Sequence, residues 1–164
     1  MRACPLVAIL AYDGLCAFEF GCAIEVFGLS RPEVGAYWYR CVVAGVEEGP
    51  LRAGSRLSVM PDGDLSLLEQ ADTIIVPGWR GVDTVVPTEL VLALQRAHAR
   101  GARLVSICSG VFVLAATGLL DGLRATTHWH HTAHLARKYP NIRVQSYVLY
   151  TEDEGLLTSA GSAA

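Results

Sequence analysis

The stretch Arg103–Gly118, RLVSICSGVFVLAATG, decides the fold of this 164-residue chain. Its apolar run Leu104–Ile107 stops at Cys108, Ser109-Gly110 follow, and apolar residues then recur at helical spacing. This order predicts a strand, a sharp turn and a helix, which together hold a side chain above the sheet at a helix N-terminus. Cys108 therefore occupies a nucleophile's position, and we expect the helix dipole and free amides to lower the pKa of its thiol. The alternative is a small buried core cysteine without chemistry.

Strands and helices alternate along the rest of the chain. Continuous apolar runs predict buried strands, and helical spacing bounded by proline and glycine predicts helices. The expected strands are 6–11, 38–44, 56–60 at an edge, 73–77, 103–107, 144–150 and 156–159, and the further expected helices are 17–29, 87–100 and 128–139. We therefore predict an α/β fold with a doubly wound, mostly parallel sheet flanked by helices, a flavodoxin-like three-layer sandwich. Ligands of such sheets bind beyond the carboxyl ends of the strands.

Length and composition favour one domain over residues 1–164. The hydrophobic fraction is 52%, yet no apolar stretch is long enough for a membrane span, and the N-terminus lacks the pattern of a signal peptide, so we expect a cytoplasmic protein. Five cysteines without CxxC spacing indicate reduced thiols. A net charge of −3 provides no basic footprint for phosphate backbones, so this segment is not expected to bind nucleic acid itself.

A glycine-rich loop, Pro77–Gly81, follows the expected strand 73–77. Glycine lets backbone amides approach a bound carbonyl or anion, so Gly78 together with the amide of Ser109 could form an oxyanion hole. We take Gly78 and Trp79 from this loop, with Cys108 and Ser109 from the turn, as the candidate ligand-binding residues.

Two further side chains could assist the thiol. His128 starts an expected helix twenty residues beyond Cys108 and could act as a base or ion-pair partner; the alternative is a helix-capping or surface histidine. Glu19 lies at the start of the first helix, beyond the carboxyl end of the first strand, and could meet the other strand ends. Its alternative role is to interact favourably with the helix dipole.

The histidines His128, His130, His131 and His134 raise the question of a metal. No HExxH motif is present and the nearest acidic residues are distant in sequence, so we expect no metal. Neither GxGxxG after a strand nor GxxxxGK[ST] occurs, so we expect no nucleotide and no other cofactor.

Four segments in order resemble the ThiJ/PfpI superfamily, the class I glutamine amidotransferase-like fold, over essentially the whole chain. They are AYDGLCAFEFGCAIEVFGL (11–29), IIVPGWRG (74–81), SICSGVFVLAATGLLDG (106–122) and RATTHW (124–129). Together they are similar to the N-terminal domain of AraC-family transcriptional regulators. The resemblance implies that Cys108 is the elbow cysteine, Glu19 the buried acid beside it and His128 the nearby histidine. It also assigns the oxyanion amides to Gly78 and Ser109.

The departures from that family pattern bear on activity. Peptidase-like members carry histidine where this chain has Ser109, and glutamine amidotransferases carry a late His-x-Glu pair where this chain has LTSAG at 157–161. In similar regulators a final helix and paired helix-turn-helix modules that bind DNA follow at this point, so the resemblance implies an isolated or shortened sensor domain that lacks them.

We therefore expect a ligand-sensing and dimerisation domain of an AraC-type regulator that binds a small-molecule effector beside Cys108 and pairs as a homodimer. Because of its departures from the catalytic members of the family, we expect it to bind its ligand without turnover. The alternative is a stand-alone isonitrile hydratase or glyoxalase-like enzyme with Cys108 as nucleophile and Glu19 as proton shuttle. A third hypothesis is a redox sensor oxidised at Cys108.

Overall fold

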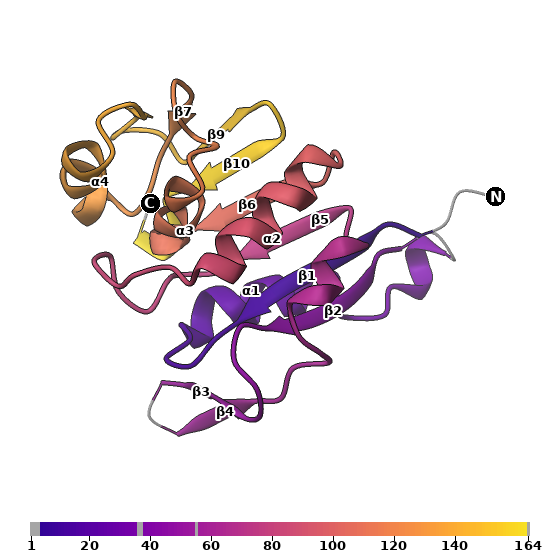
Figure 1. The fold of residues 1–164 in the computed structure, drawn as a ribbon. Helices are drawn as coiled ribbons and strands as arrows, with labels where there is room; N and C mark the ends of the chain where they lie inside the picture. Colours follow the sequence, from indigo (N-terminus) through magenta and orange to yellow (C-terminus); the bar gives the residue numbers. More distant parts are fainter. Residues whose placement is uncertain (1–3, 36–37, 55, 164) are drawn as a thin grey trace.

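A six-stranded sheet in the order β2-β1-β5-β6-β10-β9 forms the centre of the molecule in the computed structural model (Figure 1). Its strands are β1 (Leu6–Ala11), β2 (Arg40–Gly45), β5 (Thr73–Val76), β6 (Arg103–Ile107), β9 (Tyr150–Asp153) and β10 (Leu156–Ser159). All neighbouring strands are parallel except β10 and β9, which form an antiparallel hairpin. The predicted α/β fold with a mostly parallel sheet is confirmed.

The structure describes residues 4–35, 38–54 and 56–163. The remaining positions of the predicted domain 1–164 (1–3, 36–37, 55 and 164) lie outside the described residues.

Helices cover both faces of the sheet (Figure 1). They are α1 (Ala17–Phe27), α2 (Thr88–Ala99), α3 (Val111–Ala116) and α4 (Thr132–Lys138). The crossover from β1 through α1 leads to one side of β1, whereas the crossover from β5 through α2 leads to the other side of the sheet. Because both crossovers are expected to be right-handed, α1 and α2 lie on opposite faces. The expected helix 17–29 ends two residues early, where the N–H of Gly28 donates to the carbonyl of Ile24 (2.7 Å).

The core is centred on β1, whose six residues are all buried. The run Val7–Ala11 is fully inaccessible to solvent, and Ile74 and Val76 of the neighbouring β5 are equally buried. A strand covered by helices on both faces must be apolar throughout rather than alternating, which is the pattern that the sequence has here. Each fully buried Leu or Ile stabilises the fold by roughly 1.5–3 kcal/mol relative to an exposed one.

The expected edge strand 56–60 is not part of this sheet. Residues Leu57–Val59 form β4, which pairs with β3 (Leu51–Ala53) in a separate antiparallel hairpin. The partner strand was missed because it is only three residues long and bears an arginine at its centre, so it carries no apolar run.

The prediction of a strand over residues 144–150 is also wrong. The chain is extended at β8 (Arg143–Val144), which pairs with β7 (Arg124–Ala125), and again from Tyr150 onward in β9, but not between them. The apolar residues of this stretch are not buried: Tyr147 is fully exposed and Leu149 is 65% exposed. Apolar character therefore does not indicate a core strand here. The expected helix 128–139 is a 3-10 turn, Trp129–His131, followed by α4.

No helix in the described part of the chain combines the length and apolar character needed to cross a membrane.

Gly110 lies where the ends of β5 and β6 come together. A Cβ atom at this position would be 2.3 Å from the carbonyl oxygen of Val76 and 2.5 Å from that of Pro77. Its φ of −57° is one that any residue can adopt. The need for glycine here is therefore steric, and it comes from two backbone atoms that have little freedom to move.

We expect Gly110→Ala to lower the free energy of unfolding by about 3 kcal/mol, because the methyl group must displace backbone of β5. The matched control is Gly21→Ala on α1, where an added Cβ meets nothing within 4 Å. Because alanine is a better helix former, the control should be stabilised by about 0.5–1 kcal/mol. Urea unfolding followed by circular dichroism measures both changes; equal effects in the two variants would contradict this account of Gly110.

Candidate functional site

Cys108 follows directly on β6 and has a φ of +57°, in the left-handed region that a residue with a side chain rarely adopts. The 3-10 turn Cys108–Gly110 leads into α3, so the predicted strand, sharp turn and helix are present. A left-handed cysteine costs about 1–2 kcal/mol of backbone energy, which the surrounding structure must offset.

Two contacts hold this turn, one from the segment after β7 and one from the segment after β10. The hydroxyl of Thr127 donates to the carbonyl oxygen of Cys108 (2.8 Å). Gly161, just beyond β10, packs so closely that a Cβ on it would lie 2.6 Å from the Cβ of Cys108. Together with Gly110 beneath the turn, these residues fix the thiol at the carboxyl ends of β5, β6 and β10.

Glu19 lies in the first turn of α1 and is 4% exposed. Its Oε2 atom is buried and has no hydrogen-bond partner among the described residues. A Cβ on Gly78 would lie 3.6 Å from this oxygen and 3.4 Å from the hydroxyl oxygen of Ser109. The structure thus brings Glu19, Gly78 and Ser109 together around one point beside the Cys108 turn.

Burial raises the pKa of the Cys108 thiol to about 11. The backbone N–H of Ser109 acts in the opposite direction, while the charge of Glu19 and a hydrogen bond from the thiol to its carboxyl raise the pKa further. The prediction of a lowered pKa is therefore wrong. The single amide donor of a 3-10 turn is outweighed by loss of solvent and by a neighbouring acid.

Cys16 is a member of this site that the sequence analysis missed. It is the N-cap residue of α1, and its Cβ would lie 3.4 Å from a Cβ placed on Gly78. Burial, followed by a hydrogen bond to the Glu19 carboxyl, raises the pKa of its thiol. The spacing Cys-x-x-Glu at a helix start, which places the two side chains on the same end of the helix, was the available signal.

The loop after β5 is tied to the turn through its backbone. The hydroxyl of Ser109 donates to the carbonyl oxygen of Trp79 (3.2 Å), and the buried hydroxyl of Tyr12 lies 2.6 Å from the carbonyl oxygen of Gly78. The indole of Trp79 is 5% exposed, donates to the carbonyl of Thr84 (3.3 Å) and packs edge-on against Tyr12 at 4.6 Å between ring centroids. Its ring is therefore engaged within the loop.

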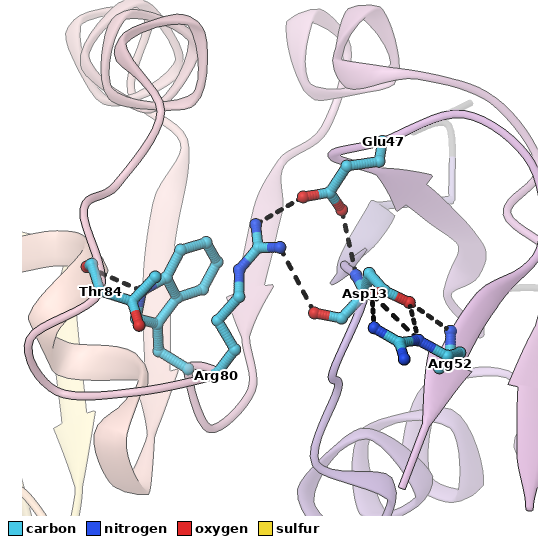
Figure 2. A network of polar contacts seen from close by, with 6 residues as sticks. Asp13, Glu47, Arg52, Arg80 and Thr84 are labelled. Atoms are coloured by element: carbon cyan, nitrogen blue, oxygen red, sulfur yellow. Dashed lines mark hydrogen bonds and ion pairs between the residues drawn. The ribbon is translucent and has the colours of Figure 1, made fainter. Parts of the chain in front are cut away.

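Arg80 links this loop to β1 and β2 (Figure 2). Its guanidinium lies 4.5 Å from the centroid of the Trp79 ring, pairs with the carboxylate of Glu47 at 2.5 Å and donates to the carbonyl of Asp13 (3.4 Å). The Asp13 carboxylate is in turn held by Arg52, and hydrogen bonds from Arg52 lower the pKa of Asp13 to about 2. This network fixes the position of the glycine-rich loop.

His128 is half-buried, and its Nδ1 accepts a hydrogen bond from the N–H of His130 (3.2 Å), which caps the 3-10 turn. Neither His128 nor any other histidine is among the main causes of the shifted pKa of the Cys108 thiol. His134 contacts the carboxylate of Asp83 (2.9 Å). Within residues 4–35, 38–54 and 56–163, no three His, Cys, Asp or Glu side chains converge on a point that could hold a metal ion.

Three cavities of the described chain have volumes of about 740, 500 and 290 Å³. None of them is lined by Cys108 or Glu19.

Comparison with curated proteins gives relatives of three kinds. An uncharacterised protein encoded in the cpoL 5′ region of Streptomyces lividans is 36% identical over 82% of this chain and 95% of its own length. The HTH-type transcriptional regulator CdhR of Pseudomonas aeruginosa is 37% identical over 94% of this chain but only 46% of its own length. The isonitrile hydratase of Pseudomonas putida is 41% identical over 49% of this chain and 36% of the enzyme. The chain thus spans less than half the length of the regulator.

Solved structures share the fold at low sequence identity. A putative transcriptional regulator from Vibrio parahaemolyticus superimposes with a TM-score of 0.86 at 20% identity, covering 98% of this chain and 86% of that one. An AraC family transcriptional regulator from Pseudomonas putida gives 0.79 at 19% identity, over 96% and 84% of the two chains.

The family model for DJ-1/PfpI proteins matches residues 6–164, which span the sheet, the Cys108 turn and Glu19. The resemblance to the ThiJ/PfpI superfamily is thereby confirmed: the chain belongs to the DJ-1/PfpI family.

Proposed function

We propose that this chain is the ligand-sensing and dimerisation domain of an AraC-type transcriptional regulator, with a small-molecule effector bound beside Cys108. The observation that carries the proposal is the buried Glu19 carboxyl, whose Oε2 has no hydrogen-bond partner among the described residues. A buried polar atom without a partner costs about 1–3 kcal/mol, so an effector that donates a hydrogen bond to it gains affinity. The amides of Gly78 and Ser109 would receive a polar group of the same effector.

The state of the thiol supports binding rather than turnover. With a pKa of about 11, only about one Cys108 in ten thousand is a thiolate at pH 7. The candidate base His128 is engaged in capping a turn. Regulator relatives such as CdhR match nearly the whole of this chain, whereas the isonitrile hydratase matches half of it. DNA would be bound by a separate domain of the regulator. The protein would be located in the cytoplasm.

The alternative remains a cysteine-dependent hydratase or glyoxalase-like enzyme. The match to isonitrile hydratase, at 41% identity over 49% of this chain, favours it. In that case Cys108 would be the nucleophile and Glu19 would move the proton.

An exposed face of α1 supports the homodimer. Phe18, Cys22 and Val26 follow one another at intervals of four residues and are all exposed, Phe18 to 62% and Val26 to 47%. An exposed apolar helix stripe of this kind offers a surface that a second copy can cover.

We expect the effector site to bind without consuming its ligand. A metabolite found by thermal-shift screening should stabilise wild type by about 2.7 kcal/mol at 100 times its dissociation constant. This stabilisation should be lost in Glu19→Gln and kept in Glu25→Gln, which makes the same change at an exposed position of the same helix. Multiple turnovers of an isonitrile, methylglyoxal, glutamine or a peptide that disappear in Cys108→Ala would instead establish the enzyme.

Sedimentation equilibrium at micromolar concentration should give twice the 17.6 kDa chain mass. Val26→Asp places a charge in the proposed interface and should shift the equilibrium to monomer. Val85→Asp, at a loop position that is 85% exposed, is the matched control and should leave the dimer intact. A wild-type mass of one chain at all concentrations would contradict the dimer.

A further inference from the structure

The 740 Å³ cavity is the largest of the three and is separate from the Cys108 site. Its walls come from the loop 45–49 after β2, from residues 60–69 and from the first two turns of α2. A volume of this size accommodates a small organic ligand.

The cavity is lined by far more acidic than basic side chains. The acidic ones are Glu47, Glu48, Asp64, Glu69 and Glu89, and the basic one is Arg96. Glu47 is neutralised by Arg80, and Asp64 accepts from the backbone N–H of Ser66 (2.9 Å). Among the described residues, no cation lies within 4.0 Å of the carboxylates of Glu48, Glu69 or Glu89. A concave surface with three unpaired carboxylates attracts cations.

Apolar side chains lie between these carboxylates. Met60 is 66% exposed and Leu92 is 46% exposed, and Pro61 and Leu65 also line the cavity. Large apolar side chains left open to solvent inside a cavity gain free energy when a hydrocarbon covers them. The occupant that fits this surface therefore has methylene groups as well as positive charge.

The carboxylates are spread around the cavity rather than gathered at one point. Glu48 follows β2, Glu69 ends the 3-10 turn 65–69, and Glu89 begins α2. In the described chain, no three acidic side chains come close enough to coordinate one metal ion. This arrangement suits an occupant with separated positive charges better than a single divalent cation.

We propose that this cavity binds a linear aliphatic polyamine. Its ammonium groups pair with Glu48, Glu69 and Glu89, and its methylene segments cover Met60 and Leu92. Arg96 lies two turns along α2 from Glu89, on the same helix face, and its charge keeps ammonium groups toward the Glu89 end. The proposal is independent of the effector site beside Cys108.

Isothermal titration of the chain with spermidine at 150 mM salt tests the proposal. We expect one saturable site, with Glu69→Gln and Glu89→Gln each weakening binding about fivefold through loss of one ion pair. Leu92→Ser, at an exposed position, should weaken binding as well. Glu25→Gln on α1, which removes the same charge outside the cavity, is the matched control and should leave the affinity within about twofold.

An equal loss of spermidine affinity in Glu25→Gln would show a diffuse counterion effect and contradict the proposed site. Saturation by Mg²⁺ at the same affinity, or no saturable heat with spermidine, would do so too. Thermal melting of each variant without ligand checks that the exposed substitutions leave the fold intact. Since Cys108→Ala leaves the cavity unchanged, that variant must bind spermidine as wild type does, whatever the outcome at the effector site.

Discussion

The left-handed backbone of Cys108 is the constraint on which the rest of the site depends. Gly110 must pack against the carbonyls at the end of β5, and Gly161 must pack against the cysteine itself. The ends of β5, β6 and β10 can meet at this turn only because both positions lack a side chain. The same crowding also leaves the thiol only partly accessible to solvent. The packing that fixes the position of the turn therefore also shifts the pKa of the thiol.

The Cys108 thiol is consequently neutral near pH 7. An exposed thiol at a long helix N-terminus would ionise readily, but here burial, Glu19 and Cys16 all raise the pKa of Cys108. The buried carboxyl retains an oxygen without a partner among the described residues, so the site has an unsatisfied acceptor and a weak donor side by side. Such a pair is better suited to holding a polar ligand than to attacking one. The Arg80 network keeps the neighbouring loop in place and connects it to Glu47, at the edge of the acidic cavity (Figure 2).

Much of this could be predicted from the sequence, because the deciding signals are local. The apolar run that ends at Cys108 specifies a buried strand and a turn, and proline and glycine delimit α2. The errors arise where tertiary contacts decide: residues 147–149 are apolar but exposed and outside the core, and β3 has no periodicity to detect. The pKa of Cys108 was predicted with the wrong sign because burial and the position of Glu19 depend on the whole sheet. Cys16 was missed although its Cys-x-x-Glu spacing to Glu19 at the start of α1 is a local signal.

The central claim is that Cys108 is held as a neutral thiol by burial and by Glu19. It is tested most directly by the pH dependence of iodoacetamide labelling, read at each cysteine by peptide mass. The account predicts that the rate at Cys108 still rises between pH 9 and pH 10.5, and that Glu19→Gln moves its midpoint to lower pH, because a carboxylate that raises the pKa is removed. A Cys108 midpoint below 8.5, or one that Glu19→Gln leaves unchanged, would contradict the account.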